Sequence, residues 1–147
     1  MTKVMIFGTF DGLHPGHLDF FRQAKTHGDF LVVSVARDRV VPQFKNQPAM
    51  FGEKERLWLV KANRFVDKAV LGDEKKEDFY NHIKDEAPDV ICLGYDQWAT
   101  EKEVRENLDK VGLTKTKIVR LKPYKGQTHK SSKMKSVAWR RSNPSAG

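Results

Sequence analysis

Two histidines three residues apart, His14 and His17, belong to the stretch GTFDGLHPGH at residues 8–17 of the chain. The apolar residues 4–7 before it predict a buried strand, and Pro15 predicts the start of a helix. Residues three apart lie on one side of a helix, so both imidazoles project from the same side of its first turn. Unpaired N–H groups and the positive end of the helix dipole attract anions there. The stretch therefore predicts a phosphate site.

Neutral imidazoles at such a helix start can donate hydrogen bonds to phosphate oxygens. Phosphoryl and nucleotidyl transfer need reactants held in line and the charge on the phosphate oxygens stabilised, which suits this donor set. Two plainer interpretations stay open. The pair could bind a metal, although zinc takes three or four protein ligands and the chain has only Cys92 and three further histidines to offer. The histidines could also serve only in capping and packing.

The remaining pattern alternates strands with helices, as the α/β class requires. The first helix begins at Pro15, with Leu18, Phe21 and Ala24 expected on its inner face. Further strands are expected at 30–36, 65–71, 89–94 and 117–121, and further helices at 53–63, 79–83, 99–111 and 131–140. We predict a Rossmann-like, doubly wound parallel sheet of five strands in one domain, residues 1–140, followed by a disordered basic and polar tail, residues 141–147.

Charge is unevenly distributed along this 147-residue chain, whose formal net charge is +8. Residues 1–109 contain 16 basic and 19 acidic side chains, whereas residues 110–147 contain 11 basic and no acidic ones. A basic rim of this kind attracts small polyanions or nucleic acid, and a merely solvated tail is the alternative. Aromatic residues in this part are too sparse for a base-stacking platform, so nucleic-acid binding is not expected. No run is apolar enough to span a bilayer, and the expectation is a cytoplasmic protein with no membrane contact.

The motif G-T-F-D-x-L-H-x-G-H resembles the signature of the cytidylyltransferase-like nucleotidyltransferases, the H-x-G-H superfamily. The resemblance implies transfer of a nucleoside monophosphate from ATP or CTP to a phosphorylated acceptor, with release of pyrophosphate. It implies that His14 and His17 are catalytic and that the backbone of Gly8, Thr9 and Phe10 approaches the nucleotide. Similarity to the family extends over nearly the whole chain, to about residue 135.

Further family marks have counterparts in this sequence. The segment Glu53-Lys-Glu-Arg56-Leu resembles a helix whose arginine helps to bind the triphosphate, and Lys45 resembles a lysine placed near the phosphates, so both residues are counted with the catalytic set. The segment Arg64-Phe65-Val66-Asp67 resembles a mark found at the dimer interface of relatives. The resemblance therefore implies a homodimer, with Arg64 and Asp67 in its interface.

The family's C-terminal motif, R-T-x-G-[IV]-S-[ST]-[ST]-[KR], holds the triphosphate at a helix start. Here it corresponds to a segment that departs from it at several positions, and the resemblance assigns nucleotide binding to four residues, Lys125, Ser131, Ser132 and Lys133. Lysine in place of arginine offers a point charge where a two-pronged donor is usual. Gly94, the last residue of the strand expected at 89–94, and Asp96, which follows that strand, are also expected to bind the nucleotide.

Asp11 and Arg37 are assigned to the phosphorylated acceptor. A divalent ion, most simply Mg²⁺, is expected to bridge the phosphates, because such ions are often held by substrate oxygens with one or two carboxylates. Asp11 is the nearest carboxylate to the motif. It could contact the ion or could orient the turn, and both roles stay open.

The segments Val35-Ala36-Arg37-Asp38 and Leu71-Gly72-Asp73-Glu74 resemble the archaeal-type FAD synthetases of this superfamily, as does Gly94-Tyr95-Asp96-Gln97. Those enzymes adenylylate FMN. Glycerol-3-phosphate cytidylyltransferase, which uses CTP and glycerol 3-phosphate, shares the first motif and is the alternative; a sugar-phosphate adenylyltransferase comes third. A nucleotide- or flavin-binding protein without catalysis is the non-enzyme alternative.

Overall fold

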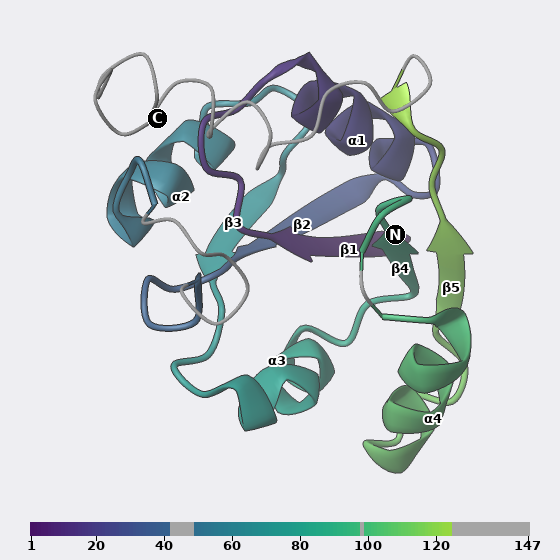
Figure 1. Cartoon of the computed structure of the whole chain (residues 1–147). Helices are drawn as coiled ribbons and strands as arrows, with labels where there is room; N and C mark the ends of the chain where they lie inside the picture. Colours follow the sequence, from purple (N-terminus) through teal and green to yellow (C-terminus); the bar gives the residue numbers. More distant parts are fainter. Residues whose placement is uncertain (42–48, 98, 125–147) are drawn as a thin grey trace.

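The computed structural model describes residues 1–41, 49–97 and 99–124 (Figure 1). Five residues with expected roles lie outside these ranges, so the structure adds nothing on them: Lys45, Lys125, Ser131, Ser132 and Lys133. The expected helix at 131–140 and the tail at 141–147 lie outside them as well.

A parallel sheet of five strands forms the centre of the molecule, as the sequence predicted. In spatial order the strands are β3 (Lys68–Leu71), β2 (Phe30–Val35), β1 (Lys3–Gly8), β4 (Val90–Leu93) and β5 (Lys117–Arg120). β1 pairs with β2 over its whole length, ending at Gly8 opposite Val35, and with β4 on its other edge. From β1 the chain adds β2 and then β3 on one side, and it then crosses over to add β4 and β5 on the other side of β1. In such sheets a ligand crevice is expected where this order reverses, at the carboxyl ends of β1 and β4.

Helices cover both faces of this sheet (Figure 1). α1 (Pro15–Lys25) and α2 (Glu53–Lys61) cover one face, and α3 (Phe79–Glu86) and α4 (Glu101–Lys110) cover the other. The alternation of β1 divides the core accordingly: Val4 and Ile6 pack with the α1 and α2 side, and Met5 packs with the α3 and α4 side. No helix in the described ranges is long and apolar enough to cross a membrane.

The inner face of α1 differs from the prediction at one position. Phe21 and Ala24 are fully buried, but Leu18 is 41% exposed. The inward stripe of the helix begins at His17, followed by Phe21 and Ala24 at intervals of four and three residues. Leu18 lies about 100° around the helix from His17 and so falls outside the stripe.

Two element boundaries differ from the sequence prediction by three residues. α3 continues to Glu86 instead of ending near Ile83, and it stops at Ala87, a residue in the left-handed conformation (φ 48°) just before Pro88. Pro88 disfavours the helical conformation at Ala87, the residue before it, and this explains why the helix stops there. The residues up to Glu86 are not restricted by the proline and stay helical. β3 begins at Lys68, so Phe65 lies in the turn that precedes the strand.

Candidate functional site

The two histidines form the start of α1 itself. His14 is the residue that caps the helix, and its Nδ1 accepts a hydrogen bond from the backbone N–H of Gly16 at 3.0 Å. Nδ1 of His17 accepts from the backbone N–H of His14 at 3.3 Å, and the two ring centres are 3.9 Å apart. A neutral ring whose Nδ1 accepts must carry its proton on Nε2. The fold therefore selects the tautomer with an Nε2–H donor in both rings.

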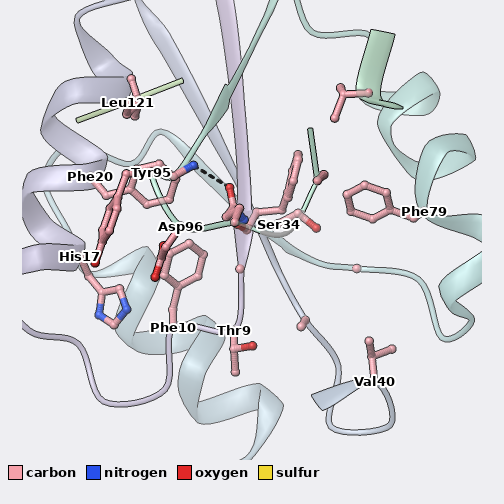
Figure 2. Close-up of a pocket in the computed structure, with 18 of the residues that line it drawn as sticks. Thr9, Phe10, His17, Phe20, Ser34, Val40, Phe79, Tyr95, Asp96 and Leu121 are labelled. Atoms are coloured by element: carbon pink, nitrogen blue, oxygen red, sulfur yellow. Dashed lines mark hydrogen bonds between the residues drawn. The ribbon is translucent and has the colours of Figure 1, made fainter. Parts of the chain in front are cut away.

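A pocket of about 540 Å³ runs along the carboxyl edge of the sheet, and both histidine rings line it. Its size is within the usual range for small-molecule sites. Figure 2 shows Phe10, His17 and Phe20 on one side of the strands and Phe79 on the other. Capping and pocket lining are thus combined in the same two side chains.

Most of the expected nucleotide residues within the described ranges line this pocket. They are Gly8, Thr9, Phe10, Gly94 and Asp96. Arg37, expected at the acceptor, lines it too, while its guanidinium donates to the carbonyl of Gly72 and pairs with Glu53. The topology brings these segments together because each follows a parallel strand that ends at the same edge.

Arg56, which the resemblance assigns to the triphosphate, is held by protein acceptors in this structure. It does not line the pocket, its side chain is fully buried, and its guanidinium donates to four protein acceptors. The acceptors are the carbonyls of Phe51 (3.0 Å), Thr9 (2.9 Å) and Ala36 (2.7 Å) and the carboxylate of Asp38 (2.8 Å). In this structure the charge of Arg56 is therefore matched by protein atoms.

Asp11 is likewise buried, at 1% exposure, and is not part of the pocket lining. Its two carboxylate oxygens accept the backbone N–H groups of Met50 (2.7 Å) and Phe51 (3.0 Å). Of the two roles open for Asp11, this geometry supports the orienting one. Two other carboxylates, Asp73 and Asp96, do line the pocket.

The side chains of Gln97 and Arg120 fix the turn that follows β4. Gln97 Oε1 accepts from the N–H of Gly94 at 2.7 Å, and its Nε2 donates to the carbonyl of Phe7 at 2.9 Å. Arg120 donates to the carbonyls of Gly94 (2.8 Å) and Ala99 (2.7 Å). These contacts attach the turn to the end of β1, next to the histidines.

Sequence reasoning missed the part of the pocket next to α3. Ser34, at the end of β2, lines it beside Phe79 and Tyr80, the first two residues of α3. The Ser34 hydroxyl is 2.9 Å from Nε2 of His82, and the Phe79 ring meets Phe7 edge to face with centres 4.8 Å apart. The sequence did contain a sign of this part of the pocket, namely that Phe79 and Tyr80 follow the loop that leaves the carboxyl end of β3.

Three titrating groups in and near the site have shifted pKa values. Burial, followed by the charge of Asp96, raises the pKa of Tyr95. Burial alone raises the pKa of the Cys92 thiol to about 12. Partial burial acts to raise the pKa of Asp38, but hydrogen bonds from Arg56 and from the Glu53 backbone outweigh it and hold this pKa below its ordinary value.

A parallel sheet with a two-histidine helix start at the end of its central strand, beside a pocket across the sheet edge, is the architecture of a nucleotidyltransferase. The cytidylyltransferase-like family matches residues 5–137. The FAD synthase of Aciduliprofundum boonei is 49% identical over 84% of this chain and 80% of its own length, and that of Methanohalophilus mahii is 48% identical over 84% of both. This chain belongs to the cytidylyltransferase-like family.

A solved structure agrees with this assignment. The crystal structure of the protein titled lipopolysaccharide core biosynthesis protein, from Thermoplasma volcanium, superposes with a TM-score of 0.80 at 40% identity. The match covers 84% of this chain and 98% of that one. The Rossmann-like fold predicted from the sequence is therefore confirmed.

Proposed function

We propose that this chain is an FAD synthase, which transfers AMP from ATP to the phosphate of FMN and releases pyrophosphate. The observation that carries the proposal is a pocket that passes the histidine pair and extends to both sides of it along the sheet edge. Two substrates can bind in such a pocket with their reacting phosphates at the histidines. The identity with curated FAD synthases, up to 49% over most of the chain, supports FMN as the acceptor rather than glycerol 3-phosphate.

In the proposed reaction an FMN phosphate oxygen attacks the α-phosphorus of ATP in line with the departing pyrophosphate. The Nε2–H groups of His14 and His17 donate to the phosphate oxygens as negative charge develops on them. The N-terminus of α1 adds its dipole to the same stabilisation. No covalent enzyme intermediate is needed, because alignment and charge stabilisation account for this class of transfer.

Mg²⁺ is the proposed cofactor, and it would neutralise charge on the triphosphate. Among the described residues no group of three His, Cys, Asp or Glu side chains is arranged to hold a metal. Asp73 and Asp96 are the carboxylates of the pocket lining and would supplement the phosphate oxygens as ligands.

A homodimer in the cytoplasm completes the proposal, with Arg64 and Asp67 at the interface. Within one chain Asp67 pairs with Lys25 and accepts from the N–H of Leu31 at 2.8 Å, and the Arg64 guanidinium lies 5.0 Å from the Phe65 ring centre. Light scattering coupled to gel filtration tests the dimer. A mass of one chain at working concentration would contradict it.

The activity is tested by incubating the purified chain with ATP, FMN and Mg²⁺ and measuring FAD by chromatography and pyrophosphate by a coupled assay. Parallel reactions contain CTP in place of ATP, or glycerol 3-phosphate in place of FMN. We expect FAD and pyrophosphate in equal amounts from ATP and FMN. Formation of CDP-glycerol without FAD would overturn the assignment of FMN as the acceptor. If none of the substrate pairs gave a product, the proposed enzyme activity would be overturned.

A further inference from the structure

Phe10 adopts a backbone conformation that costs free energy. Its φ of 54° lies in the left-handed region, which is uncommon for a residue with a large side chain. A strained residue persists only where its surroundings enforce the conformation.

The Phe10 ring supports the second histidine. It is 4% exposed and meets the His17 ring edge to face, with centres 5.5 Å apart, and it also packs on Phe21 at 5.2 Å. The ring folds back over Gly8, where a Cβ would lie 3.0 Å from its Cζ atom. The orientation of His17 thus depends on the conformation at Phe10.

The Arg56 side chain holds the residue before this turn. One terminal nitrogen, Nη1, donates both to the carbonyl of Thr9 and to that of Ala36, and so connects the ends of β1 and β2. Nε donates to the carbonyl of Phe51, and Nη2 pairs with Asp38. Together with Arg56 these four residues are called the Arg56 network below.

Asp11, one residue after Phe10, reinforces the same arrangement. Its carboxylate binds the N–H groups of Met50 and Phe51, and the Phe51 carbonyl in turn accepts from Arg56. The strained residue therefore has a buried anchor on each side, Arg56 through Thr9 and Asp11 directly. Both anchors converge on the segment before α2.

We propose that Arg56 is a positioning residue for the transfer step. It holds the turn at Thr9 and Phe10, and through the Phe10 ring it sets the orientation of His17, while the triphosphate is bound by other groups. A guanidinium has five N–H donors, and four of the hydrogen bonds they can make go to protein atoms in a fully buried position. The proposal rests on the proposed transfer reaction, since it assigns the residue a part in that reaction.

Two substitutions separate positioning from triphosphate binding. Arg56→Lys keeps the positive charge but cannot reach all four acceptors, whereas Arg56→Gln removes the charge. Positioning predicts that kcat for FAD formation falls about 100-fold in both variants, while the Kd for ATP stays within about threefold of the unchanged protein. Triphosphate binding predicts instead that Gln weakens ATP binding and that Lys restores it.

Arg105→Lys is the matched control. Arg105 also donates to two backbone carbonyls, those of Thr116 and Leu113, and pairs with Asp109, but these residues surround the amino-terminal end of β5. We expect this control to lose thermal stability and to keep its kcat. Equal kcat in Arg56→Lys and Arg105→Lys would overturn the proposal, because Arg56 would then be merely stabilising.

A spectroscopic measurement does not depend on activity. Arg56→Lys is expected to shift the imidazole ¹H–¹⁵N signals of His17 in the substrate-free protein, and Arg105→Lys is expected to leave them in place. Unmoved His17 signals would overturn positioning even if the protein makes no FAD, so failure of the activity and failure of the proposal are distinguishable. If the Arg56 variants do not fold, Asp38→Asn weakens the Arg56 network from its exposed side, and an unchanged kcat and spectrum in that variant would overturn the proposal.

Discussion

Replacement of His14 by asparagine separates the two roles that the structure gives this side chain. His14 caps α1 through Nδ1, 3.0 Å from the Gly16 N–H, and its ring lines the pocket. Asparagine is among the best capping residues, and its side-chain oxygen can accept the same N–H. His14→Asn therefore keeps the cap and removes the imidazole, whereas His14→Ala removes both.

The expected magnitudes follow from these contacts. Loss of a cap costs about 1 kcal/mol, which lowers the melting temperature of a chain of this size by about 3 °C, so His14→Ala should melt lower than His14→Asn. Loss of one well-placed donor lowers turnover about 100- to 1000-fold, or roughly 3–4 kcal/mol of transition-state stabilisation, and this loss should be the same in both variants.

The assay combines thermal melting of each variant with its kcat for FAD formation at saturating ATP and FMN. Thr100→Ala provides the control for capping alone, because the Thr100 hydroxyl caps α4 by accepting from the Glu103 N–H at 3.1 Å. It should melt lower and keep its turnover. A His14→Asn protein that turns over at nearly the normal rate would refute the donor role, and one that melts as low as His14→Ala would refute the capping argument.

Three further outcomes are expected. The pKa values of Asp38 and Asp67 in the folded chain lie below the ordinary 3.8, so these carboxylates stabilise the fold above about pH 4. Their contribution to the free energy of unfolding disappears as the pH falls through the lowered values, which urea unfolding at pH 7, 4 and 3 measures. Asp67→Asn should make the free energy of unfolding depend less on pH in this acid range. The buried Cys92 thiol, whose pKa is raised to about 12, should not react with a thiol reagent at pH 8 until urea unfolds the chain; rapid labelling of the folded protein would contradict its burial. Chelation by EDTA should abolish FAD formation, with recovery on adding Mg²⁺, and should leave the melting temperature of the substrate-free chain unchanged; a lower melting temperature would indicate a structural metal.

Strand and helix order could be predicted because each strand is a short apolar run and two of the helices, α1 and α4, carry a start signal of their own. Pro15 begins α1 as expected, and Thr100 precedes α4 with Glu101 and Glu103 in its first turn. The parallel topology then places the ends of the strands at one edge. For that reason Gly8 and Gly94, 86 residues apart in the sequence, could be assigned to one site before their positions were known.

Side-chain direction could not be predicted in the same way. A lone arginine on an expected helix gives no sign of which way it points, and Arg56 points inward because three carbonyls and Asp38 form a polar site for it. The carboxylate of Asp11 is similarly directed by two N–H groups that lie 39 and 40 residues along the chain. Such acceptors exist only after the chain has folded.

The hydrogen bonds at the first turn of α1 have a consequence for acid conditions. Each imidazole accepts a main-chain N–H through Nδ1, so a proton added to that nitrogen abolishes the acceptor. Acidification would then loosen the helix start at the moment when the rings gain charge. Inactivation by acid and fraying of this turn should accordingly occur together, seen in turnover and in amide exchange at His14 and Gly16.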